Sequence, residues 1–256
     1  WPDILSIGPK LGSLGESDNR LYLNDGDGTF SLYANNAVFD MSSYTVPGND
    51  DWPAGASFGD LDNDGDLDIV IGQHFESALH GTAQKIRVLL NDGASQPAFT
   101  DVTDAVGIAG LKIKQPDVEI QDYDNDGYMD IRVSATIDVA GVQTPVIFYN
   151  TKGATGSLGF ALPAGMDPAA FAGYPSTYDP SYVWVNPRYF PGAPTADYNN
   201  DGTLDIFGDE VWIKWGYDAP LYENTTAPGQ WLDVRVDTTA AGENRGGIGA
   251  VVRVYQ

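Results

Sequence analysis

Aspartates crowd one short stretch of the chain, FGDLDNDGDLDIVIG at residues 58–72. They occupy every second position: Asp60, Asp62, Asp64, Asp66 and Asp68. In a compact turn, carboxylates this close repel one another unless a cation neutralises them. Calcium binds six to eight oxygen atoms, and a loop with side-chain ligands at positions 1, 3, 5 and 9, a glycine at 6 and a backbone carbonyl at 7 can wrap around one ion. The spacing therefore predicts a calcium loop in which Asp66 contributes its carbonyl.

The pattern occurs twice more, in QDYDNDGYMDIRVSA and ADYNNDGTLDIFG. The candidate ligands of the second loop are Asp122, Asp124, Asp126, the carbonyl of Tyr128, and Asp130; those of the third are Asp197, Asn199, Asp201, the carbonyl of Thr203, and Asp205. Recurrence of one motif along a chain is typical of repeat architectures. We therefore expect about three Ca²⁺ sites. The third has one charge fewer, at Asn199, and should bind calcium most weakly.

The residues that follow each loop indicate strands rather than helices. The helix-loop-helix calcium motif needs a glutamate at position 12, where this chain has Ile71. The run after Asp68 is β-branched and ends at a glycine, which is typical of a short buried strand. The first residues, WPDILSIG, match the tail of the same loop, with Asp3 aligned to Asp68. The chain is therefore expected to open inside a repeat.

A second element accompanies the loops. It is a strand ending in asparagine, followed by a turn rich in glycine and aspartate, as in RLYLNDGDGTF at 20–30, RVLLNDGASQPAFTDVT at 87–103, VIFYNTKGATGSLGF at 146–160 and PLYENTT at 220–226. In the first three copies an aromatic residue begins a return strand, which predicts a hairpin. Loop and strands together make a four-stranded antiparallel sheet, the size of one propeller blade. The predicted fold class is all-β, a β-propeller.

FGDLDNDGDLDIVIG together with LYLNDGDGTF resembles the FG-GAP or VCBS type of repeat, found in integrin α-subunit heads and many secreted bacterial proteins. The resemblance implies calcium-binding propeller blades over residues 1–223. The segment NTTAPGQWLDVRVDTTAAGENRGGIGAVVRVY is similar to the beginning of an ASPIC/UnbV domain, as in cartilage acidic proteins, and implies a second unit at 224–256. About four repeats fit this length, and closed propellers have four to eight blades, so the length allows either a small closed propeller or a fragment of a larger one. Because both ends of the sequence fall inside motifs, we expect the fragment.

The composition limits the classes of molecule that this protein can bind. The chain has 36 acidic and 13 basic residues and a formal charge of −23, which argues against nucleic acid. No apolar run approaches the roughly 20 residues of a membrane span. We expect a secreted or cell-surface protein whose partner is an extracellular protein or glycan, another chain, or the missing part of its own propeller.

Catalytic signals are weak. Cysteine is absent, and the two histidines, His74 and His80, have no accompanying nucleophile motif. The basic residues near aromatic or loop segments form no recognisable constellation: Lys112, Lys114, Arg188 and Lys214. We therefore expect a non-enzyme, a calcium-binding module for adhesion, matrix or cell-surface assembly in which calcium is structural.

Two alternatives stay open. The first is a carbohydrate-active lyase or hydrolase, which would need a cleft with Arg or Lys near a Tyr, His or carboxylate away from the loops. The second is a building block of a surface filament or layer.

Residues 165–194 interrupt the repeats. GMDPAAFAG at 165–173 predicts a short helix with Asp167 as N-cap. The aromatic and proline-rich segment 174–194 either covers a neighbouring blade or contacts a partner. Further along, Asn224-Thr225-Thr226 is an acceptor pattern for N-glycosylation.

Overall fold

The computed structural model describes residues 2–8, 19–39, 53–73, 84–93, 97–108, 110–111, 117–166, 188–189, 194–208 and 220–226. Within these ranges the chain forms short strands in antiparallel sheets, with one 3-10 helix and one single-turn α-helix. The predicted all-β class is therefore confirmed. No helix in this part of the chain is long and apolar enough to cross a membrane.

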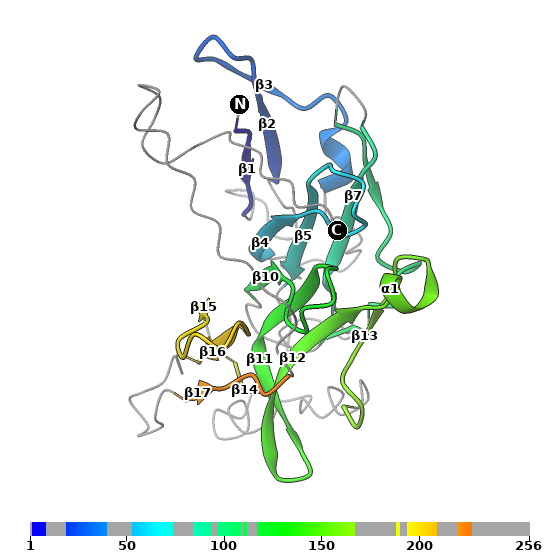
Figure 1. The fold of residues 1–256 in the computed structure, drawn as a ribbon. Coiled ribbons are helices and arrows are strands. Elements are labelled where there is room, and N and C mark those ends of the chain that lie inside the picture. The colour runs from blue at the N-terminus through cyan, green and yellow to red at the C-terminus, as the bar shows by residue number, and fades with distance from the viewer. Residues whose placement is uncertain are drawn as a thin grey trace, which may run out of the picture.

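Four sheets follow one another along the chain (Figure 1). The first sheet contains β1 (Ile4–Ser6), β2 (Arg20–Asn24) and β3 (Phe30–Leu32), followed by the 3-10 helix η1 (Asn36–Phe39). The second contains β4 (Pro53–Gly59), β5 (Asp68–Gln73), β7 (Arg87–Asn91) and β8 (Phe99–Asp101).

The third sheet contains β10 (Val118–Gln121), β11 (Asp130–Val139), β12 (Val142–Asn150) and β13 (Phe160–Ala161), with β14 (Arg188–Tyr189) paired to β11. The fourth contains β15 (Thr195–Ala196), β16 (Asp205–Phe207) and β17 (Leu221–Tyr222). A separate pair joins β6 (Gln84–Lys85) to β9 (Gly110–Leu111). The second and third sheets thus have the expected order of four antiparallel strands.

The hairpins form where the sequence predicts them. Phe30, Phe99 and Phe160 each begin the return strand of a hairpin. Between β12 and β13 the turn additionally contains the single-turn helix α1 (Lys152–Thr155), which the sequence did not indicate. The helix ends there because Gly156 takes a left-handed conformation, φ 78°, and its N–H donates to the Lys152 carbonyl at 2.7 Å.

Hydrophobic cores lie between the sheets. On β5, the side chains of Ile69 and Ile71 belong to the core shared with the first sheet, while Val70 belongs to the core shared with the third. All three are fully buried. Because both faces of the strand are covered, the run IVI needs no polar alternation. Burying each such side chain stabilises the fold by about 1.5–3 kcal/mol.

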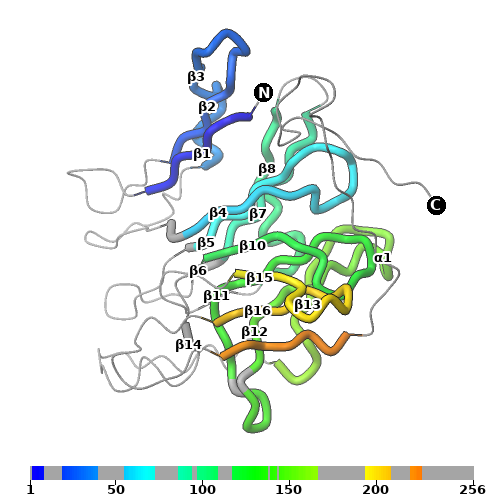
Figure 2. The backbone as a smooth tube through the Cα atoms, turned by 60° about the vertical axis from the view of Figure 1, so that its left-hand side comes forward, coloured from blue at the N-terminus to red at the C-terminus, as the bar shows by residue number. Residues whose placement is uncertain are grey.

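Strand β10 of the third sheet lies beside β4 of the second, and β15 lies beyond β10 (Figure 2). The close approach requires a glycine, because a Cβ at Gly59 would overlap the side chain of Ile120. A hydrogen bond from Ile120 N to Ser57 Oγ, 3.3 Å long, crosses the same interface. The glycine of the FG dipeptide therefore serves sheet-to-sheet packing.

Several sequence predictions lie outside the described residues. They are the helix from Asp167 onward, the segment 174–194 apart from β14 and Pro194, both histidines, Lys112, Lys114, Lys214, and residues 227–256 of the predicted C-terminal unit.

Candidate metal-binding loops

The first aspartate of each loop holds the loop closed. Asp60 accepts hydrogen bonds from the backbone N–H groups of Asp64 and Gly65 at 3.1 and 3.0 Å. Asp122 and Asp197 make the same pair of bonds in the second and third loops, 2.8–3.1 Å long. The turn also needs left-handed residues at position 4, which are Asn63, Asn125 and Asn200 with φ of 57–58°. Asparagine tolerates this conformation better than most residues.

The ninth residue of each loop fastens the loop to the hairpin. Both carboxylate oxygens of Asp68 accept backbone N–H groups, from Leu61 at 2.8 Å and from Asn91 at 2.9 Å. The bonds recur at the equivalent positions of the other two repeats: Tyr123 and Asn150 to Asp130, and Tyr198 and Asn224 to Asp205. Asp3 likewise accepts the N–H of Asn24 at 2.8 Å. Position 9 is therefore a structural clamp as well as a candidate ligand.

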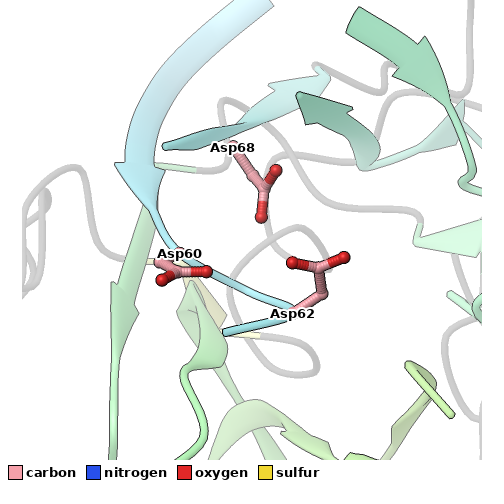
Figure 3. Close-up of side chains that lie close together, drawn as sticks. All are labelled: Asp60, Asp62 and Asp68. Atoms are coloured by element: carbon pink, nitrogen blue, oxygen red, sulfur yellow. The ribbon is translucent and has the colours of Figure 1, made fainter. Parts of the chain in front are cut away.

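Carboxylates converge in two of the loops. Asp60, Asp62 and Asp68 each bring one oxygen within 4.8 Å of the others, pointing into a common space (Figure 3). In the second loop the converging residues are Asp122, Asp124 and Asp126. The carboxylates of the predicted ligands Asp64 and Asp130 lie outside these two groups. Within residues 194–208, the carboxylates of the third loop form no such group.

In the first two loops, burial and neighbouring negative charges disfavour the ionised form of some carboxylates. Burial raises the pKa of Asp62, and the negative charge of Asp64 raises it further. Burial and the charge of Asp126 do the same to the pKa of Asp124. Asp62 Oδ1 is buried without a hydrogen-bond partner among the described residues. A buried carboxylate oxygen with no donor is costly, and an all-oxygen set of this kind fits a hard cation such as calcium.

One cationic group approaches the first loop from the third sheet. Lys152, at the start of α1, donates from Nζ to the backbone carbonyl of Asp62. Its charge lowers the pKa of Asp62, against the larger effect of burial. A single ammonium therefore offsets only part of the negative charge of this loop.

In the third loop, the neutral Asn199 stands where the other loops have an aspartate, and both Asn199 and Thr203 donate hydrogen bonds to Asp201. Asn199 Nδ2 donates to Asp201 Oδ2 at 2.9 Å, and Thr203 donates to Asp201 Oδ1 from both its hydroxyl and its N–H. The hydrogen bonds from Thr203 lower the pKa of Asp201, and the one from Asn199 adds to the effect. That the third loop binds calcium most weakly stays a prediction.

The hairpin asparagines are functional residues that the sequence analysis quoted but assigned no role. Asn150 donates from Nδ2 to the carbonyls of Met129 and Leu61 at 3.0 and 2.9 Å, and its Oδ1 accepts the N–H of Lys152. Their recurrence at the end of all four strand segments, as Asn24, Asn91, Asn150 and Asn224, was the available signal. Asn224 repeats the pattern, donating to the Tyr123 carbonyl at 2.8 Å. A glycan attached to Asn224 Nδ2 would replace one of the two hydrogens of the amide that makes this bond.

A buried polar cluster was missed altogether. Arg132 pairs with Glu119 at 2.7 Å and donates from Nε to the Tyr123 hydroxyl at 3.0 Å. Thr195 of the fourth sheet donates to the other Glu119 oxygen at 2.7 Å. Arg132 is 3% and Tyr123 is 1% exposed, and burial raises the pKa of Tyr123. The sequence did contain a signal for this cluster: Arg132 on β11 stands at the position that Val70 occupies on β5.

The clamp aspartates make stability depend on pH. Burial raises the pKa of Asp68 to about 6 and that of Asp130 to about 7. Because these values lie above the unfolded value near 4, the folded protein binds more protons within this window. In a chelator, the free energy of unfolding should therefore fall as the pH rises from about 4 to about 7, by roughly 3 kcal/mol through Asp68 alone.

Urea unfolding at several pH values measures this slope, and carboxyl ¹³C NMR assigns the titrations. Asp201, whose pKa is lowered, is the internal control and should titrate below its ordinary range. Midpoints near 4 for both Asp68 and Asp130 would contradict the prediction.

Comparison with known proteins supports the repeat assignment. Residues 1–71 match the family model of the FG-GAP-like repeat. The match ends within β5, so it includes the first sheet and the first loop with the strands on either side. No curated protein matches the chain. FG-GAP repeats fit a propeller-like all-β fold, consistent with successive antiparallel sheets that pack face to face.

Proposed function

We propose that this chain is a non-catalytic, calcium-binding β-propeller module of the extracellular space, which serves adhesion, matrix or cell-surface assembly by binding a protein or glycan. Its calcium is structural. The observation that carries the proposal is the buried, unpartnered Asp62 Oδ1 beside the carboxylates of Asp60 and Asp68. The FG-GAP-like match over residues 1–71 supports the extracellular setting, because such repeats are typically extracellular.

The residues of each loop have different roles in the proposed site. In the first loop, the oxygens of Asp60 and Asp62 would hold the ion, and the carbonyl at position 7 is a further candidate ligand. Asp68 joins them while its two backbone hydrogen bonds fasten the loop to the next hairpin. A bound cation supplies positive charge that relieves the repulsion between these carboxylates. Metal binding is then coupled to the folding of each sheet.

The alternative of a carbohydrate-active enzyme needs accessible catalytic groups. The cluster of Arg132, Tyr123 and Glu119 has the residue types expected of such a site, but Tyr123 itself lies in the second loop, between Asp122 and Asp124. Arg132 and Tyr123 are buried and already paired with each other, so a substrate cannot contact them without local unfolding. Their burial supports a structural role and favours the binding module. Release of reducing ends from polysaccharides by the calcium-loaded chain would favour the enzyme instead.

Calorimetric titration of calcium into the chelator-treated full chain tests the proposal. Asp60→Asn/Asp62→Asn and Asp122→Asn/Asp124→Asn should each remove one binding event, because each variant removes two carboxylate charges from one loop. The matched control is Asp25→Asn/Asp27→Asn, which removes the same charge from the exposed hairpin turn between β2 and β3. The control should keep the wild-type stoichiometry.

Asn199→Asp adds a charge to the third loop and should tighten its binding of calcium. An absence of binding heat in the wild-type chain, or equal losses in the hairpin control and the loop variants, would refute the proposal.

A further inference from the structure

The three loops are joined to one another by a repeated pair of hydrogen bonds. Asn63, at position 4 of the first loop, donates from Nδ2 to the carbonyl of Gly127, at position 6 of the second, at 3.1 Å. Asn125 of the second loop donates in the same way to Gly202 of the third at 2.9 Å. The same two types of position are therefore linked at both loop interfaces.

A second bond runs in the opposite direction at each interface. The hairpin asparagine of the following sheet donates back to the residue at position 2 of the preceding loop. Asn150 reaches the Leu61 carbonyl at 2.9 Å, and Asn224 reaches the Tyr123 carbonyl at 2.8 Å. Each interface thus contains two hydrogen bonds, one between the two loops and one from the asparagine of the following sheet to the preceding loop.

These bonds depend on the closed shape of both loops. The donor Asn63 and the acceptor Gly127 both have positive φ, 57° and 89°, which the turns themselves impose. Without a cation, the close carboxylates of each loop repel one another and favour opening. A loop that opens withdraws the donor or acceptor that its neighbour uses, so closure of one loop favours closure of the next.

Resting on the proposed calcium function, we propose that neighbouring loops bind calcium with positive cooperativity, transmitted by the Asn63–Gly127 and Asn125–Gly202 hydrogen bonds. The second loop couples to both of its neighbours, because it accepts from the first and donates to the third. Such coupling is reciprocal: an ion in the first loop raises the affinity of the second by the same factor as the reverse. One hydrogen bond of ordinary strength corresponds to a factor of about five.

Loop-specific affinities can be measured in the full chain by NMR. The amides of Gly65, Gly127 and Gly202 each donate to the first aspartate of their own loop, at 3.0, 2.9 and 2.8 Å, and report its closure. Calcium is titrated into the ¹⁵N-labelled chain and into Asp124→Asn/Asp126→Asn, which weakens the second loop while keeping its oxygen ligands. The Kd read at Gly65 should rise about fivefold in this variant.

Asn63→Gly then tests the route of the coupling. Glycine accepts the positive φ at no steric cost, so the substitution removes only the amide. In the wild type, weakening the second loop raises the Kd at Gly65 about fivefold. In Asn63→Gly, the same weakening should leave this Kd nearly unchanged. The matched control is Asn200→Gly in the third loop, whose side chain makes no hydrogen bond to another loop in the described part of the chain. It should leave the coupling between the first two loops unchanged.

Two results would overturn the proposed cooperativity, and only the second would also overturn the proposed calcium-binding function. If the Kd at Gly65 is the same whether or not the second loop is weakened, the loops bind independently, and the calcium-binding function stands without cooperativity. If none of the three glycine amides responds to calcium, the cooperativity falls together with the proposed function. An unchanged coupling in Asn63→Gly would also reject the hydrogen bond as its carrier.

Discussion

Chelation of divalent ions will lower the thermal midpoint of this protein by about 10–20 °C. Each ion at a hundred times its Kd stabilises the folded state by about 2.7 kcal/mol, and the two loops with converging carboxylates together contribute about 5 kcal/mol. In a chain of this size, each kcal/mol shifts the midpoint by about 2–4 °C. The physical cause is the return of repulsion between carboxylates such as Asp60 and Asp62 once the cation is gone.

Differential scanning calorimetry with calcium, with chelator, and with calcium restored after chelation measures this shift. Restored calcium should recover the full midpoint. A variant that combines Asp60→Asn/Asp62→Asn with Asp122→Asn/Asp124→Asn serves as the control, because it lacks the charges that need an ion and should respond little to chelator. An unchanged midpoint and unchanged strand content in the chelated wild type would show that the loops close without ions.

Arg132→Ala is expected to reduce the free energy of unfolding by about 3–5 kcal/mol. The substitution leaves the half-buried Glu119 carboxylate, 27% exposed, and the buried Tyr123 hydroxyl without their cationic partner, and the resulting desolvation penalty exceeds the contribution of the pair itself. Thr195 of the fourth sheet also bonds to Glu119. The loss should therefore speed hydrogen exchange at β15 and β16 more than elsewhere.

Arg87→Ala provides the matched control. Arg87 forms a 2.7 Å pair with Asp101 in the second sheet, where the two side chains are 15% and 39% exposed. Solvent partly screens this pair, and the guanidinium also donates to the Val38 carbonyl at 2.9 Å, so the substitution should cost about 1–2 kcal/mol. Urea unfolding of both variants in saturating calcium makes the comparison. Equal costs for the two arginines would contradict the assignment of Arg132 as a buried ion-pair partner of Glu119.

The ligand spacing and the strands that flank it could be predicted from the sequence because they depend on neighbours in the chain. Alternating aspartates with a glycine at position 6 determine a turn in which Asp60 meets the N–H of Gly65, five residues away. A β-branched run after the loop determines a strand, observed as β5. The aromatic residue after each hairpin turn marked the return strand equally well.

The missed residues act across sheets. Asn150 reaches Leu61 across 89 positions of sequence, and Thr195 reaches Glu119 across 76. No periodicity in a single sequence encodes these contacts, since the position of one sheet relative to the next follows from the packing of both faces of each strand. Arg132 illustrates the limit, because a buried charged side chain is tolerated only where a partner lies opposite it, here Glu119 on the adjacent strand β10, which Thr195 of the fourth sheet also contacts.

The sequence by itself determined that this protein is all-β, that it repeats a loop of aspartates, and which oxygens each loop offers, since local turn and strand geometry follow from residues a few positions apart. Only the tertiary structure decided which carboxylates converge, how the ninth aspartate joins loop to hairpin, and that the loops bond to one another. The physical reason is that these arrangements depend on backbone groups brought together by packing between sheets, whose partners lie tens of residues away.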